Sequence, residues 1–136
     1  MATPNGWLPS HSVAALLLAT ARAGTRPASN LIEELLTEHI RVPGLSADAL
    51  MHSASEEIEA SWKDSGLRGV LSSLQAHCAR LSDSLDEGDR RRIVGQMLQV
   101  ASAVSGDRTR EANIRAFPYA AARVWKLDDV AQTIIR

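Results

Sequence analysis

Apolar residues recur at helical spacing along most of the chain, at intervals of three and four residues. The run from Val13 to Ala19 lies in an expected helix at about Ser12–Arg22. A second expected helix begins near Pro27, where proline is tolerated at the first helical position, and ends at Pro43-Gly44. Its apolar stripe consists of Leu31, Ile32, Leu35, Leu36 and Ile40. No stretch combines period-two alternation with hairpin turn residues, so the pattern predicts an all-α protein.

Capping residues and breaks place the remaining helices. Ser46 and Asp86 stand where an N-cap side chain would accept a hydrogen bond from the first turn, and Ser10 or Ser12 could cap the first helix. Pro118 removes a backbone donor, so we expect a kink or a restart there. The later helices are expected at about 46–62, 67–81, from Asp86 to the Ser105-Gly106-Asp107 break, 109–125 and 130–135.

The chain length fits one domain. Its 136 residues are enough to bury a self-sufficient core. We expect residues 1–10 to form an irregular N-terminal arm and residues 11–136 to form a single helical domain. The predicted fold is an all-α, single-domain bundle of about six to seven helices built from two similar helical hairpins.

Charge is distributed unevenly between the two halves. Residues 1–66 carry four basic and eight acidic side chains, a net charge of −4, whereas residues 67–136 carry eleven and eight, a net charge of +3. The halves could attract each other within one chain or between two copies. The whole chain has a net charge of −1, and its longest basic run, Arg90-Arg91-Arg92, follows three nearby acids. Because phosphate neutralisation supplies most nucleic-acid affinity, we expect no nucleic-acid partner.

Cysteine usage and the first apolar run bear on the compartment. Cys78 is the only cysteine, so we expect a reducing compartment and a buried, inert thiol. The run from Val13 to Ala19 is shorter than the ~20 residues of a membrane span. It also lacks the preceding basic residues of a signal peptide. We therefore expect a core helix and a cytoplasmic protein.

Two parts of the sequence are weakly similar. The segment Leu17–Ala23 is followed by a glycine-containing break, a helix and Leu45–Asp48. The segment Met97–Ala103 is followed by the same order of features, ending in Leu127-Asp128-Asp129. With the linking Leu85-Asp86-Glu87, this doubled pattern resembles the tellurite-resistance TerB-like family of all-helical proteins, over about residues 12–134.

The resemblance implies a role in the stress response, through protein partners near the membrane, with cations bound by acidic loops. This chain departs from the family pattern, because Ala23-Gly24 lacks the loop aspartate and Asn30 replaces the later glutamate. In the second loop Asp107 and Glu111 are spaced i, i+4 and could face one cation, although two ligands are few for a tight site. The chain therefore looks like a degenerate member whose metal binding is in doubt.

A transition-metal site is the alternative. His52, Glu56 and Glu59 share one face of a predicted helix, and imidazole with carboxylate suits zinc or iron. Residues of the second helix would have to complete the site, but they lack the paired Glu-x-x-His motif of carboxylate bundles. These partner residues are Glu33, Glu34, Glu38 and His39.

Catalytic patterns are not evident. No serine lies in a Gly-x-Ser-x-Gly elbow, and no glycine-rich phosphate loop is present. The four histidines show no third partner for a triad. They are His11, His39, His52 and His77.

We therefore expect a non-catalytic, stress-response-related protein-interaction module without a required cofactor. Trp7, Trp62 and Trp125 are the candidate interface anchors, provided that they are exposed. Expected partners are proteins, in a membrane-associated complex or as a second copy in a homodimer. A metal-binding bundle is the alternative function, with a divalent cation as its cofactor, and an enzyme of unrecognised chemistry is the third.

Overall fold

The computed structural model describes residues 9–22, 28–40, 44–104 and 111–134. These residues form helices and contain no strand, which confirms the predicted all-α, single-domain bundle. The described helices are α1 (Pro9–Arg22), α2 (Ser29–Thr37), α3 (Ala47–Leu81), α4 (Glu87–Val104), α5 (Glu111–Val124) and α6 (Asp128–Ile134).

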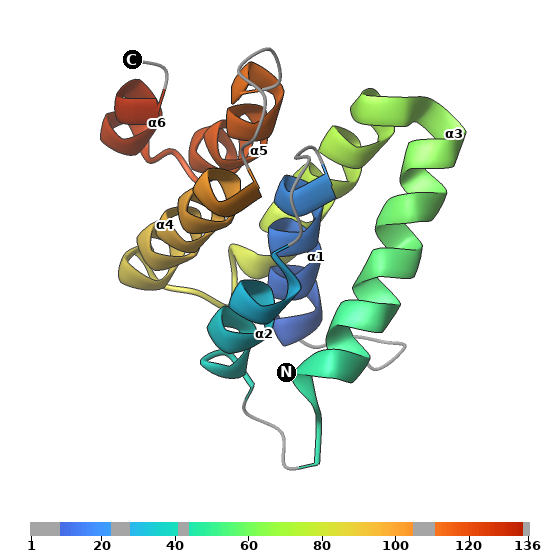
Figure 1. Ribbon diagram of the computed structural model, residues 1–136. Coiled ribbons are helices and arrows are strands. Elements are labelled where there is room, and N and C mark those ends of the chain that lie inside the picture. Colours follow the sequence, from blue (N-terminus) through green and yellow to red (C-terminus); the bar gives the residue numbers. More distant parts are fainter. Residues whose placement is uncertain (1–8, 23–27, 41–43, 105–110, 135–136) are drawn as a thin grey trace.

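Helix α1 is the centre of the bundle. It contacts α2, α3, α4 and α5, and the side chains from Ser12 to Leu17 are all buried. Figure 1 shows α1 between α3 on one side and α4 and α5 on the other. The apolar run from Val13 to Ala19 is therefore core, as its composition predicted. None of the described helices combines the length and apolar character that crossing a bilayer requires.

Helix α3 is bent at one residue. The predicted break at Gly66 is present, but it is a corner without a loop: Gly66 alone leaves helical geometry, with φ 61° and ψ −144°. We call residues 47–65 the first arm and residues 67–81 the second arm. The two arms approach closely beside the corner, where a Cβ on Gly69 would lie 2.5 Å from the backbone oxygen of Ser61. Figure 1 shows α3 folding back at this corner.

The second half of the chain packs against this frame. Helix α5 contacts α3, α4 and α6, and it continues through Pro118 as one helix, so the predicted restart does not occur. Phe117 is fully buried in the core. Trp125 follows α5 and is also buried, and its indole Nε1–H donates to the carbonyl of Cys78 at 2.9 Å. This bond joins the end of α5 to the second arm of α3.

Two predicted caps are confirmed and one is wrong. Ser46 Oγ accepts from the Ala49 amide at 3.1 Å, and Asp86 Oδ1 accepts from the Asp89 amide at 2.8 Å. Ser10 and Ser12 do not begin the first helix, because α1 starts at Pro9 and buries both serines. The predicted arm is therefore helical from Pro9 onward, and its residues 1–8 lie outside the described ranges.

The close approach of the two arms predicts that alanine has opposite effects on stability at Gly69, beside the corner, and at Gly95, in α4. Gly69→Ala places a methyl against the backbone of Ser61, and we expect it to lower the free energy of unfolding by about 1–3 kcal/mol. Gly95→Ala in α4 meets no atom within 4 Å, and we expect it to raise stability by roughly 0.5–1 kcal/mol. Denaturant unfolding measures both, and equal effects would contradict the close approach of the arms.

Candidate functional site

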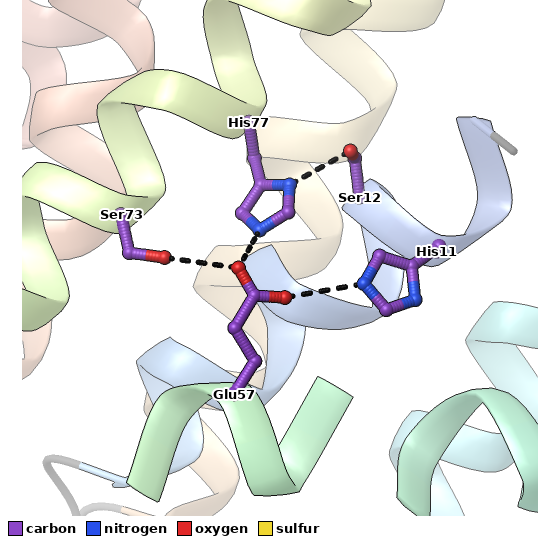
Figure 2. Close-up of polar contacts among 5 residues, drawn as sticks. All are labelled: His11, Ser12, Glu57, Ser73 and His77. Carbon is purple, nitrogen blue, oxygen red and sulfur yellow. Dashed lines mark hydrogen bonds and ion pairs between the residues drawn. The ribbon is translucent and has the colours of Figure 1, made fainter. Parts of the chain in front are cut away.

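The largest group of interacting polar side chains among the described residues lies where α1 meets both arms of α3. His11 and Ser12 come from α1, Glu57 from the first arm, and Ser73 and His77 from the second arm (Figure 2). We call these five residues the Glu57 cluster. Its hydrogen bonds join positions that lie 16 to 65 residues apart in the chain.

The Glu57 carboxylate is the shared acceptor of the cluster. His77 Nε2 lies 2.8 Å from Oε1, and His11 Nε2 lies 3.1 Å from Oε2. Ser73 Oγ donates to Oε1 from 3.4 Å. Because an ionised carboxylate only accepts, both imidazoles donate through Nε2. One carboxylate therefore joins the first arm to α1 and to the second arm.

His77 is held on both ring nitrogens. Its side chain is buried, and Ser12 Oγ lies 2.8 Å from Nδ1. With the proton of a neutral ring on Nε2, Nδ1 accepts from the Ser12 hydroxyl. Neither polar end of this buried imidazole is left without a partner, which is the condition for burying such a group at low cost.

The cluster favours the ionised form of Glu57. Hydrogen bonds from His11 and His77 hold the pKa of the Glu57 carboxyl far below its ordinary value, although partial burial acts in the opposite direction. The two imidazole rings lie near each other, with centroids 5.9 Å apart. Glu57 therefore provides the negative charge that a pair of adjacent histidines requires when either ring is protonated.

Ser12, His77 and Glu57 form a hydrogen-bonded Ser–His–Glu series. The prediction that no histidine has a triad partner was therefore wrong for His77. Such a series can activate a hydroxyl nucleophile when a substrate reaches it. Here Ser12 is 0% exposed, so its hydroxyl faces the core rather than a substrate. The arrangement ties three helical segments together.

A second feature is a pocket between α1, α2 and the first arm of α3. Its volume is about 190 Å³, and Ile32 and Ile58, both buried, form part of its lining. Arg22 and Glu59 also line it and form an ion pair, with Arg22 Nε 2.6 Å from Glu59 Oε1. The remaining lining residues are Leu18, Ala21, Ala28, Ser29 and Ser55.

Trp62 extends the surface beside this pocket. It is only partly buried, and the Arg22 guanidinium lies 4.5 Å from the centre of its ring. A cation above an aromatic face is attracted to the ring quadrupole, which orders the arginine. Arg22 thus connects the predicted anchor Trp62 to the pocket.

The other predicted anchors are placed differently. Trp125 is 4% exposed and belongs to the core, so the condition of exposure on which its prediction depended is not met. Its ring packs in the core while its N–H finds a carbonyl, the usual arrangement for a buried tryptophan. Trp7 lies outside the described residues, as does Asp107. Glu111 begins α5, but its side chain is outside the description.

The predicted transition-metal residues separate into different ion pairs. His52 Nε2 and Glu56 Oε1 are 3.0 Å apart on the surface of the first arm, whereas Glu59 binds Arg22. Directly after α2, Glu38 pairs with Arg92 and His39 bonds to Gln96. Among the residues that the structure describes, no group of three histidine, cysteine or acidic side chains has the geometry to hold a metal ion.

No family model, curated protein or solved structure matches this chain. The similarity to TerB-like proteins therefore rests on the sequence pattern alone, and functional inference depends on the geometry of the pocket and the Glu57 cluster.

The ionised Glu57 predicts a pH-dependent contribution to stability. We expect Glu57→Gln to lower the free energy of unfolding by about 1–2 kcal/mol near neutral pH, because a buried imidazole loses its charged partner while water partly screens the site. The folded pKa is depressed, so this contribution is complete above the ordinary value of 4.5 and is lost as the pH falls below it. Denaturant unfolding from about pH 7 to about pH 3 should show that the difference in unfolding free energy between Glu57→Gln and wild type becomes smaller as the pH falls.

Glu56→Gln is the matched control, since Glu56 is the exposed neighbour that pairs only with exposed His52. We expect this variant to stay within about 0.5 kcal/mol of wild type. If the difference in unfolding free energy between Glu57→Gln and wild type did not change with pH, Glu57 would not be an ionised acceptor of the two histidines.

Cys78 supplies a second prediction. Burial raises the pKa of its thiol to about 12, so the reactive thiolate is scarce. We expect a thiol reagent at about pH 8 to leave the folded chain unmodified and to label one thiol after denaturation. Rapid labelling of the folded protein would show that the core around the second arm opens.

Proposed function

We propose that this chain is a non-catalytic helical module that binds another protein, with the pocket between α1, α2 and α3 as its contact site. The observation that carries the proposal is the pocket itself, which combines an apolar interior with an ion pair and whose Arg22 packs on the partly buried Trp62. Apolar depressions edged by arginine and tryptophan are typical of the contacts that dominate binding energy.

The size and lining of the pocket suit one apolar side chain. Ile32 and Ile58 offer aliphatic surface, while Ser29 and Ser55 are exposed and leave the opening polar. An aliphatic or aromatic anchor from a partner would displace water from that surface, which is the main favourable term in association.

The charge of the helices that form the pocket favours a basic partner segment. Glu33 and Glu34 are exposed on α2, and Glu56 is exposed on the first arm of α3. The half of the chain that contains the pocket has a net charge of −4. Lysine or arginine beside the apolar anchor would complement this surface and raise the association rate. We therefore propose a partner segment with an apolar anchor flanked by basic residues.

A stress-response role and a cytoplasmic location remain part of the proposal. The doubled hairpin pattern supports the first through its similarity to TerB-like proteins, and the single cysteine supports the second.

Peptide binding tests the proposed site. The probe is a short lysine-rich peptide with one central leucine, added to isotope-labelled protein while methyl and amide NMR signals are followed. We expect shifts to concentrate at Leu18, Ile32 and Ile58. A glutamate-rich peptide with the same leucine and a lysine-rich peptide without it should bind at least about tenfold more weakly, because each lacks one of the two proposed contributions.

A plugging variant makes this prediction specific. Ser55→Trp places a large ring at an exposed position of the pocket lining, and we expect it to abolish the peptide shifts while the fold is retained. Ser53→Trp is the control, because Ser53 is exposed on the same helix but does not line the pocket. Equal loss of binding in both variants, or shifts that avoid the pocket in wild type, would overturn the proposal.

A further inference from the structure

Gly66 separates two halves of the chain with a single backbone conformation. Its φ of 61° and ψ of −144° are the mirror image of polyproline II geometry, which only glycine adopts without steric cost. The residues on either side are helical, and no loop intervenes. If Gly66 took helical angles, which glycine also allows, the two arms of α3 would become one continuous helix.

Straightening α3 would separate surfaces that are buried in the closed chain. Helix α1 belongs to the first half, and it packs against α4, α5 and both arms of α3. Its apolar face includes Val13, Leu16 and Leu17, all at most 2% exposed. An open single chain would expose this face to water. The open form therefore requires another protein surface that packs against this face as the second half does in the closed chain.

The second half of another copy has that shape, and it also has the complementary charge. The ion pairs that cross between the halves, among the described residues, take their acid from the first half: Glu57 with His77 and Glu38 with Arg92. The same polarity appears in the net charges, −4 before the corner and +3 after it.

We propose that two copies of this chain form a dimer by exchanging halves at Gly66. In the dimer residues 9–65 of each copy pack against residues 67–134 of the other, and α3 is straight. Each cross-half contact of the closed chain is made again between the copies, with Glu57 of one chain bonded to His77 of its partner. The pocket is lined only by residues between Leu18 and Glu59, so the exchange leaves it intact.

Gly66→Ala tests the proposal. Alanine is strained at the angles of the corner and favoured at helical ones, so the variant shifts the chain toward the straight helix. Light scattering after size exclusion should give the mass of two chains, with a helical circular dichroism signal as strong as that of wild type and a near-ultraviolet tryptophan signal like that of the monomer. Gly95→Ala, an alanine substitution at an open helical site, should remain monomeric.

A folded, monomeric Gly66→Ala would overturn the proposal, and so would a dimer in both variants, which would indicate association through a surface. If Gly66→Ala fails to fold, a refolding experiment on the wild-type chain tests the exchange instead. The chain is refolded from denaturant at rising protein concentration, and the fraction that elutes as dimer is measured. Exchange predicts a rising dimer fraction that persists for hours after dilution, because the halves must unfold to return. A monomer at every concentration, or a dimer that dissociates at once, contradicts it.

Discussion

The bend of α3 at Gly66 is the constraint on which the rest of the structure depends. On a straight helix Glu57 and His77 would lie about 30 Å apart, since each residue adds 1.5 Å. The corner instead brings their side chains to 2.8 Å and leaves a space between the arms and α4 that α1 fills (Figure 1). A side chain at position 66 would meet no neighbouring atom, so it is the backbone conformation that requires glycine there.

The Glu57 cluster shows how a group of polar side chains can join the helices of a core. Its Ser–His–Glu series has the same order of residues as a nucleophilic triad, but the serine is fully buried. Burying His77 costs free energy unless both nitrogens are bonded, and the partners are Glu57 of the first arm and Ser12 of α1. The His77 imidazole therefore has hydrogen-bond partners on both nitrogens only when the two arms fold against each other and against α1. The proposed contact site is a separate feature of the first arm, an apolar pocket that Arg22 and Glu59 line and that lies beside Trp62.

Local signals predicted most of the helices, because spacing, caps and breaks act over a few residues; the caps at Ser46 and Asp86 are examples. The predicted end of the second helix at Pro43-Gly44 was wrong, because α2 ends at Thr37. The cluster could not be derived in the same way, since its bonds join residues that are 16 to 65 positions apart. One signal was available: His77 occupies the buried stripe of the second arm with Leu74 and Leu81, where a polar residue needs partners. The sequence also indicated a break near Gly66 but not its angle, which depends on how the arms pack.

The central claim is that the bend places an ionised Glu57 between two histidines. A carbon-13 NMR titration of the glutamate carboxyl groups in the folded protein tests it most directly. We predict that the pKa of Glu57 lies well below the ordinary glutamate value of 4.5, and that the chemical shifts of the His77 ring change as Glu57 titrates. A Glu57 carboxyl that titrates at the ordinary value of 4.5 would mean that it faces water, and would contradict both the cluster and the bend that forms it.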